Sequence, residues 1–173
     1  MRRLVRPELD QELASYLERM QGILDRGGDL EAMWKAQRSS TSMRRIERVL
    51  AGMAGRRERC MYCEDSRGTD IEHYRPKGRF PGHVFFWLNL LLICGGCNRC
   101  KGHRFEIDPS GQPLLIDPTA EDPWDFLYFD PLTGEITARW DGATGNENPR
   151  GIYTLHVLAP LRYQAVTEGR RRI

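Results

Sequence analysis

Two Cys-x-x-Cys pairs in the middle of the chain constrain its fold more than any other feature of the sequence. Cys60 and Cys63 form the first pair, and Cys94 and Cys97 form the second after thirty intervening residues. Four thiolates in this spacing are typical of a structural zinc site, which leaves no coordination position open. The alternative is that all four are small buried side chains without a metal. We therefore predict one structural Zn²⁺ that joins the two pairs.

Disulfide bonds are not the expected use of these residues. The chain has five cysteines, an odd number, and all of them lie between Cys60 and Cys100. No apolar run reaches the ~20 residues of a membrane span, and the basic N-terminus has no apolar segment behind it. We therefore expect a cytoplasmic protein, without a membrane segment or a secretory signal, in which disulfides are rare. Cys100 is then either a free thiol or a weaker ligand of the zinc.

The segment between the cysteine pairs carries side chains suited to phosphodiester hydrolysis. This reaction needs a base that takes a proton from water and a cation that stabilises the leaving oxygen. His73 is the expected base, although a lone histidine is more often structural. Its neighbour Glu72 is a hard oxygen donor of the kind that Mg²⁺ or Mn²⁺ prefers. Adjacent side chains of a strand point to opposite faces, so both can act only at the irregular end of a strand.

Two asparagines lie close to the second cysteine pair. Asn98 directly follows Cys97, where it either caps a helix or binds the catalytic metal through its amide oxygen. Asn89 begins a short apolar run, where it is either a turn residue or a hydrogen-bonding strut for the loop that bears His73. The functional alternatives together predict a catalytic set of Glu72, His73, Asn89 and Asn98.

Positive charge is concentrated near these residues rather than spread over the chain. The net charge is only +2, so no global basic field is expected. Basic side chains nevertheless crowd the segment between and after the cysteine pairs, where they are either solvated or in contact with nucleic-acid phosphates. Beside a nuclease-like site we favour phosphate contacts, which are predicted for Arg75, Lys77, Arg99, Lys101 and Arg104.

Hydrophobic periodicity predicts helices in the first part of the chain. Apolar residues recur at three- and four-residue steps over 7–26, and Pro7 suits the first turn of that helix. A short second helix is expected after the capping residue Asp29, and a third helix over 42–54. Residues 1–55 are therefore predicted to be a helical segment.

The middle part of the chain is predicted to contain the strands. Short strands are expected over 69–74 and 90–93, with a loop between them and a helix that starts near Cys97 or Asn98. This gives a core over 56–107 in the order strand, loop, strand and helix.

Turn signals dominate the last third of the chain, where Asp-Pro and Gly dipeptides recur. A hairpin is expected between strands at 126–129 and 135–140. Residues 151–173 read as helical, with a break or kink at Pro160. Residues 108–173 are therefore predicted to be a turn-rich hairpin with a C-terminal helical extension.

These pieces together resemble the HNH endonuclease family. The matching segments are Asp70-x-Glu72-His73-x-x-Pro76, Asn89-Leu90-x-x-Ile93-Cys94 and Cys97-Asn98-x-x-Lys101-Gly102. The resemblance implies an α+β fold with a zinc-stapled ββα-metal core of the HNH, or His-Me finger, type. It implies that His73 is the general base, that Asn89 orients it, and that Glu72 and Asn98 hold the catalytic Mg²⁺. The chain departs from the family pattern at Glu72, where Asp is usual, and at Asn98, where His is frequent.

A closer resemblance covers more of the chain. Phe85 to Gly102 carries most of it, and Leu115 to Pro118 adds to it. These segments are similar to the HNH subunit of Septu-type and retron-associated anti-phage defence systems. Such subunits act with an ATPase, so the resemblance implies an ATPase partner that restrains or licenses a DNA-cleaving subunit. The expected docking faces are the helices near the two ends, through Leu13, Leu17, Met20 and Ile23 or the stretch around Leu158 and Leu161. The abrupt end at Ile173 also predicts a longer natural protein.

The leading hypothesis is therefore a metal-dependent DNA endonuclease with a structural Zn²⁺ and a catalytic Mg²⁺ or Mn²⁺. One alternative is a non-catalytic zinc-stapled module that binds nucleic acid or a protein partner. Another is an RNA-cleaving toxin on the same scaffold. Glu72, His73 and Asn98 discriminate between the first two hypotheses, since a binding module has no need to align these side chains.

Overall fold

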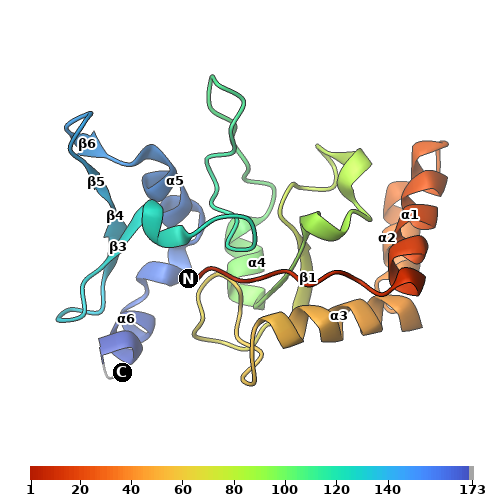
Figure 1. Cartoon of the computed structure of the whole chain (residues 1–173), viewed down its shortest axis with the longest axis horizontal. Helices are drawn as coiled ribbons and strands as arrows, with labels where there is room; N and C mark the ends of the chain where they lie inside the picture. Colours follow the sequence, from red (N-terminus) through yellow and green to blue (C-terminus); the bar gives the residue numbers. More distant parts are fainter. Residues whose placement is uncertain (172–173) are drawn as a thin grey trace.

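The computed structural model describes residues 1–171, and its elements follow one another from one end of the molecule to the other (Figure 1). The first helices lie at one end, two strands and a helix lie in the middle, and the C-terminal strands and helices lie at the other end. This is the mixed α+β architecture that the sequence predicts. The last two residues of the predicted C-terminal helix, 172 and 173, lie outside the described residues. Among residues 1–171, no helix is both long and apolar enough to cross a membrane.

The N-terminal part consists of helices α1 (Gln11–Asp25), α2 (Leu30–Gln37) and α3 (Thr41–Met53). Each helix follows a residue whose side chain accepts a hydrogen bond from an amide of the first turn. These capping pairs are Asp10 with Leu13, Asp29 with Ala32, and Ser40 with Met43. The first helix therefore begins at Gln11 rather than at Pro7, because the Asp10 carboxylate sets its start.

The middle part contains strand β1 (Asp70–His73), strand β2 (Leu90–Ile93) and helix α4 (Gly95–Lys101). The strands pair antiparallel, with Asp70 opposite Ile93 and His73 opposite Leu90. All four residues of β2 are buried, which accounts for its continuous apolar sequence. The strand–strand–helix order agrees with the prediction.

Two details of this middle part differ from the sequence-based expectation. The connection between the strands is not a plain loop, because it holds two short 3₁₀ turns, Pro81–His83 and Trp87–Asn89. Helix α4 begins at Gly95 rather than near Cys97, because the sulfur of Cys94 accepts a hydrogen bond from the Cys97 amide and caps the helix. The helix therefore starts inside the second cysteine pair.

The C-terminal part opens with a 3₁₀ turn (Pro123–Asp125) and a hairpin of β3 (Leu127–Phe129) and β4 (Ile136–Ala138), inside the two segments predicted for it. A second small hairpin, β5 (Trp140–Asp141) with β6 (Asn146–Glu147), was not expected. The helical stretch divides into α5 (Pro149–Val157), a 3₁₀ turn (Ala159–Arg162) and α6 (Gln164–Arg171). The division falls at Pro160, where the ring prevents the helix from continuing.

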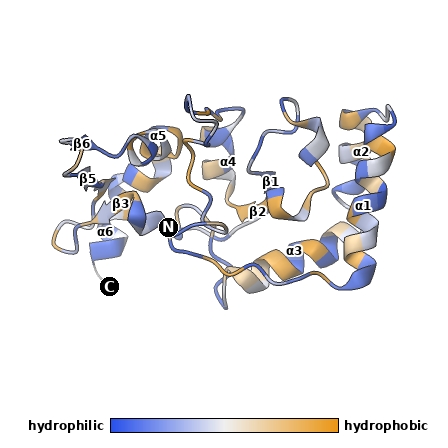
Figure 2. Cartoon of the chain, turned by 45° about the horizontal axis from the view of Figure 1, so that its top comes forward, coloured by the Kyte–Doolittle hydropathy of each residue, from blue (hydrophilic) through white to orange (hydrophobic). Residues whose placement is uncertain are grey.

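One hydrophobic core connects the three parts of the chain, since buried residues from Met1 to Leu161 form a single cluster. Helix α3 packs against β2, and Figure 2 shows apolar residues on both elements. The hairpin of β3 and β4 packs against α5 through β4. The domain boundaries near residues 55 and 107 remain a prediction.

The prediction that the apolar stripes of the helices form docking faces is wrong for most of the residues named. Leu13, Leu17 and Met20 of α1 are buried in this chain's own core. The same holds for Leu158 and Leu161, which are fully buried. Ile23 is the exception among these residues, with an exposed fraction of 39%. The apolar stripes therefore cover the core of the molecule itself and do not indicate a partner.

Candidate metal centre and active site

The four cysteines of the two Cys-x-x-Cys pairs meet at one buried point. Their Sγ atoms all lie within 4.8 Å of one another, and the Cys63 and Cys94 sulfurs are 3.8 Å apart. Four thiolates at about 2.3 Å from a tetrahedral Zn²⁺ have sulfur–sulfur distances of about 3.8 Å. The cluster therefore has the composition and the approximate spacing of a structural zinc site. Cys100 does not belong to it, since its Sγ lies 3.8 Å from the Tyr163 hydroxyl.

Backbone hydrogen bonds hold the first cysteine pair against the end of β2. The Met61 amide donates to the Leu92 carbonyl, and the Thr69 amide donates to the Ile93 carbonyl. The turn that follows Cys63 places Glu64 at a positive φ of 56°. The second pair comes directly after β2, so pairing of this segment with the strand brings all four sulfurs together.

The four thiols also influence one another's protonation. The Cys63 sulfur beside Cys60 raises the pKa of Cys60 to about 12, and the neighbouring Cys60 thiol lowers the pKa of Cys63. Proximity to Cys60 and Cys63 likewise raises the pKa of Cys97. The protein alone therefore does not hold four thiolates at neutral pH. A divalent cation would remove these protons, because a thiol that coordinates a metal is deprotonated.

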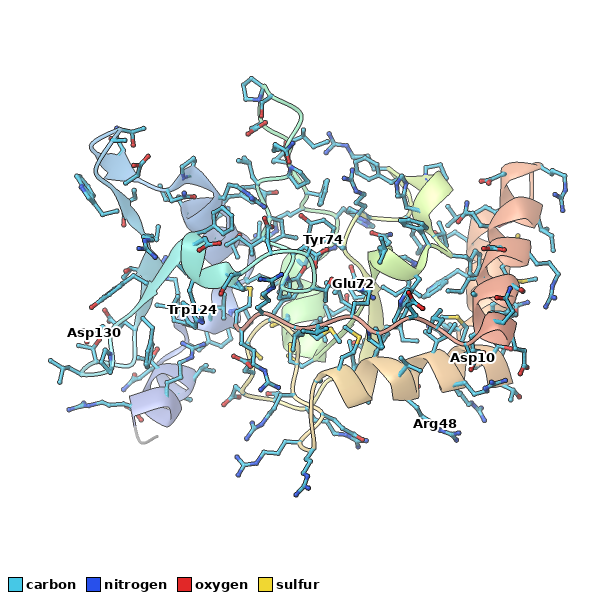
Figure 3. The ribbon with its side chains drawn as sticks, in the orientation of Figure 1. Asp10, Arg48, Glu72, Tyr74, Trp124 and Asp130 are labelled. Atoms are coloured by element: carbon cyan, nitrogen blue, oxygen red, sulfur yellow. The ribbon has the colours of Figure 1, made fainter. Side chains whose placement is uncertain are left out.

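Three of the four predicted catalytic residues line one cavity of about 430 Å³, which lies along β1. Glu72 and His73 come from β1 and Asn98 from α4, and Figure 3 shows Glu72 in the middle of the molecule. The wall of this cavity also includes Trp34, Arg38, Glu47, Asp70 and Lys77. The N-terminal helical part therefore contributes directly to the site, which the sequence did not indicate.

The His73 ring is buried and neutral at pH 7. Its side chain is 3% exposed, and burial lowers the pKa of His73 to about 4. Its Nε2 lies 3.0 Å from the Val84 carbonyl oxygen. A carbonyl oxygen only accepts hydrogen bonds, so the neutral ring carries its proton on Nε2 and its lone pair on Nδ1. The Trp34 ring packs edge-on against His73, with centroids 4.4 Å apart.

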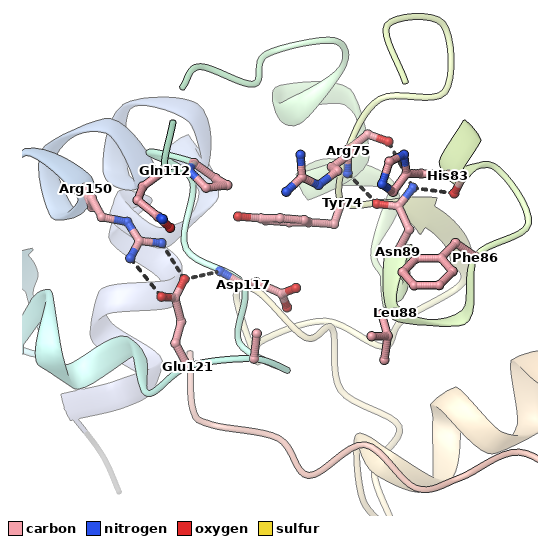
Figure 4. Close-up of a pocket in the computed structure, with 12 residues that line it drawn as sticks. Tyr74, Arg75, His83, Phe86, Leu88, Asn89, Gln112, Asp117, Glu121 and Arg150 are labelled. Atoms are coloured by element: carbon pink, nitrogen blue, oxygen red, sulfur yellow. Dashed lines mark hydrogen bonds and ion pairs between the residues drawn. The ribbon is translucent and has the colours of Figure 1, made fainter. Parts of the chain in front are cut away.

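Asn89 fixes the turn that follows His73. Its side-chain oxygen accepts a hydrogen bond of 2.7 Å from the Arg75 amide, and its Nδ2 donates to the Arg75 and His83 carbonyls (Figure 4). It is 2% exposed and lines a different cavity, of about 340 Å³, together with Tyr74 and Asp117. These contacts are those of a strut rather than of a metal ligand. Its effect on catalysis remains a prediction.

Two polar pairs join β1 to α4. The Asn98 Nδ2 donates to Asp70 Oδ2 over 3.0 Å, and the Lys101 Nζ donates to Glu72 Oε1 over 2.8 Å. Asp70 and Glu72 are two residues apart and so lie on one face of β1, and Asn98 and Lys101 are three residues apart and so lie on one side of α4. These two surfaces face each other. Asn98 does not cap α4, because Cys94 does. Asp70 was not predicted as a site residue, although its spacing from Glu72 puts both on one face of the strand.

Lys101 lies in a different environment from the one expected of a phosphate contact. Its side chain is fully buried, and its ammonium also donates to the His73 carbonyl over 2.7 Å. This position is incompatible with a direct contact to nucleic acid. Sequence alone could not show this, because its stem is buried by packing between α4 and β1.

The other basic residues predicted to contact phosphate lie in varied surroundings. Arg99 and Arg104 are exposed. Arg75 is half-buried over the rings of Phe80 and Phe105, at 5.5 and 5.6 Å. Lys77 forms an ion pair with Glu31 of α2. Their contacts with nucleic acid remain predictions.

The donor set in the cavity fits a hard cation, although it is not closed around one. Asp70, Glu72 and Asn98 all supply side-chain oxygens to the same cavity, and such oxygens suit Mg²⁺. Within residues 1–171, however, the cysteines are the one group of three or more His, Cys, Asp or Glu side chains whose ligand atoms lie within 4.8 Å of one another. Mg²⁺ would therefore keep several waters here, as it usually does in proteins.

Burial of His73 predicts a pH dependence of stability. The folded protein keeps this ring neutral down to about pH 4, whereas the unfolded chain protonates it near pH 6.5. Between these values the unfolded state binds more protons, so the free energy of unfolding should fall as the pH drops from 6.5 to 4, by up to about 3 kcal/mol. Urea unfolding at about pH 7.5 and about pH 4.5 measures this loss.

The matched control for this measurement is His73→Gln, which keeps a neutral polar side chain that does not titrate. Protonation of the cysteine cluster at low pH weakens both proteins alike. The parent should therefore lose more stability than the variant. Equal losses in the two proteins would show that His73 titrates normally in the folded state.

Comparison with known proteins points to one kind of relative. No family model matches the chain, and no solved structure matches it. Septu protein PtuB of Bacillus thuringiensis is 37% identical over 70 residues, which cover 38% of this chain and 26% of that protein. Septu protein PtuB of Bacillus mycoides (strain KBAB4) is 31% identical over 128 residues, which cover 57% of this chain and 43% of that protein. The chain is thus similar to Septu protein PtuB and spans between a quarter and somewhat less than half of the length of these relatives.

Proposed function

We propose that this protein is a metal-dependent HNH endonuclease that hydrolyses DNA phosphodiester bonds as the effector of an anti-phage defence system. The observation that supports this best is the cavity along β1. It brings a buried, neutral His73 together with the oxygens of Asp70, Glu72 and Asn98, next to a cysteine cluster suited to zinc. The strand–strand–helix order agrees with the resemblance to HNH enzymes.

In the proposed reaction His73 takes a proton from a water molecule as the water oxygen bonds to phosphorus. The bond from phosphorus to the leaving oxygen then breaks. A catalytic Mg²⁺ or Mn²⁺, held by Glu72, Asn98 and Asp70, would stabilise the negative charge on that oxygen. Asn89 keeps the turn after His73 in place through its three hydrogen bonds. The zinc has no part in the chemistry and joins the cysteine pairs, because a four-cysteine site has no open position.

The defence role and the partner rest on similarity. The similar proteins are both named Septu protein PtuB, and the matched regions cover a part of each. We propose that the protein acts in the cytoplasm together with an ATPase subunit. The expected docking residues Leu13, Leu17, Met20, Leu158 and Leu161 do not form the docking surface, since they are buried.

Incubation of the purified protein with supercoiled plasmid and with a structured RNA, in Mg²⁺ or Mn²⁺, tests the proposal. We expect the plasmid to be nicked or linearised and the RNA to remain intact. If the protein alone is inactive, the assay is repeated with any ATPase that is encoded beside it. Cleavage of RNA alone would favour a toxin, and binding without cleavage under all of these conditions would favour a non-catalytic module.

The non-catalytic alternative has one observation in its favour. The Glu72 carboxylate already pairs with a buried ammonium group at 2.8 Å, so the expected metal ligand is neutralised in this structure. A purely structural ion pair between β1 and α4 would look the same. The distinction depends on whether Glu72 can also bind a cation.

A further inference from the structure

The buried ion pair between Lys101 and Glu72 lies at the centre of the site and has no assigned role. The Lys101 side chain is fully buried, whereas the Glu72 side chain is 15% exposed. Transfer of an ammonium group out of water is strongly unfavourable unless a charged partner and further acceptors compensate it. Lys101 has both, through Glu72 Oε1 at 2.8 Å and the His73 carbonyl at 2.7 Å. One cation thus contacts two consecutive residues of the proposed site.

The two oxygens of Glu72 are in different situations. Oε1 accepts from Lys101, while Oε2 makes no hydrogen bond within the described part of the chain. Glu72 lines the cavity, so one side of its carboxylate faces the Lys101 ammonium and the other is available to a cation. A divalent ion on Glu72 would therefore lie a few ångströms from a fixed positive charge, which repels it.

The charges around the cavity are balanced rather than uniformly acidic. Its wall contains the carboxylates of Glu47, Asp70 and Glu72, and also the cations Arg38 and Lys77, of which Lys77 is paired with Glu31. Lys101 adds a third cation behind Glu72. A balanced site of this kind binds a free divalent ion weakly, while a bound phosphate group would add the negative charge that it lacks.

We propose that Lys101 is a positioning residue that holds Glu72 and lowers its affinity for a divalent cation until a nucleic-acid phosphate shares the ion. The inference rests on the proposed function and names a regulation of the same site. Metal and nucleic acid then bind cooperatively, and by linkage each raises the affinity for the other by the same factor. Protein without nucleic acid then holds little catalytic metal, and cleavage is confined to active sites that have nucleic acid bound.

Titration of Mn²⁺ into the zinc-loaded full chain, followed by calorimetry or by the loss of free Mn²⁺ signal, tests this inference without any activity assay. Lys101→Met removes the charge, and we expect it to tighten Mn²⁺ binding by at least about tenfold, which corresponds to about 1.4 kcal/mol. Lys101→Arg keeps the charge and should bind as weakly as the parent. Adding Glu72→Gln to Lys101→Met should abolish the gain, because the ligand itself is lost.

Removal of a buried lysine can impair folding, so zinc content and thermal unfolding are measured for each variant. Lys101→Gln is the second neutral variant, because it keeps a hydrogen-bond donor. The parent also provides a test of its own: its Mn²⁺ affinity should rise at least about tenfold when a short DNA duplex is present. Folded neutral variants that bind Mn²⁺ no more tightly than the parent would overturn the inference. Equal Mn²⁺ affinity of the parent with and without DNA would do the same.

The two proposals fail in distinguishable ways. If the parent cleaves plasmid but the neutral variants show no gain in Mn²⁺ affinity, the endonuclease assignment stands and Lys101 is only structural. If the gain is seen but no nucleic acid is cleaved, with or without the ATPase, the metal site is real and the nuclease proposal is wrong.

Discussion

Replacement of Cys60 by serine is expected to release the zinc and unfold the middle of the chain. The four sulfurs lie within 4.8 Å of one another, so one Zn²⁺ bound there would hold both cysteine pairs at the end of β2. Binding energy at such a site is folding energy, on the order of 10 kcal/mol. That exceeds the stability margin of many single domains. Elemental analysis should find about one zinc per parent chain and none in Cys60→Ser, with a large fall in the thermal unfolding temperature.

The matched control is Cys100→Ser. Cys100 is the one cysteine outside the cluster, and its sulfur lies near the Tyr163 hydroxyl instead. This variant should keep its zinc and its unfolding temperature. Well-folded parent protein without zinc would contradict the structural role of the cluster. The same holds if Cys100→Ser loses its zinc while Cys60→Ser keeps it.

Replacement of His73 by alanine is expected to slow plasmid cleavage by roughly 10²- to 10⁴-fold while the fold and the zinc are retained. The imidazole is neutral because burial lowers the pKa of His73 to about 4, so it can accept a proton at neutral pH. Alanine provides no group for that step. Initial rates of plasmid nicking in Mg²⁺, measured at matched zinc content, give the factor.

His103→Ala is the control for this experiment. His103 is exposed, follows α4 and is not among the residues that line the cavity. Its replacement should leave the rate unchanged. Parental rates in His73→Ala would remove His73 as the base, and the HNH assignment would fail with it.

The parts of the fold that the sequence predicts are those determined by local residues. The position of α2 follows from the Asp29 cap, and β2 follows from four consecutive apolar residues. The cysteine cluster is predictable because ligand spacing is itself a local property. The start of α4 was misplaced because a cysteine sulfur caps this helix, a role that Ser, Thr, Asp or Asn usually takes.

The parts of the site that the sequence misses depend on packing between distant segments. Trp34 reaches His73 from α2, at a separation in the chain that no motif covers. Lysine is usually a surface residue, and only the contact of α4 with β1 shows that Lys101 is buried beside Glu72. The stripes on α1 looked like a partner surface because the sequence does not show that α3 and the loop before β2 cover them.

The claim that a second divalent metal, distinct from the zinc, drives cleavage is tested most directly by restoring metal to stripped protein. Protein treated with EDTA is first checked by elemental analysis to confirm that it keeps about one zinc per chain. It is then incubated with supercoiled plasmid, without and with added Mg²⁺, in the presence of the ATPase. We expect no cleavage without added metal and nicking or linearisation that rises with Mg²⁺. Full cleavage by the zinc-only protein, or intact plasmid at every Mg²⁺ concentration, would contradict it.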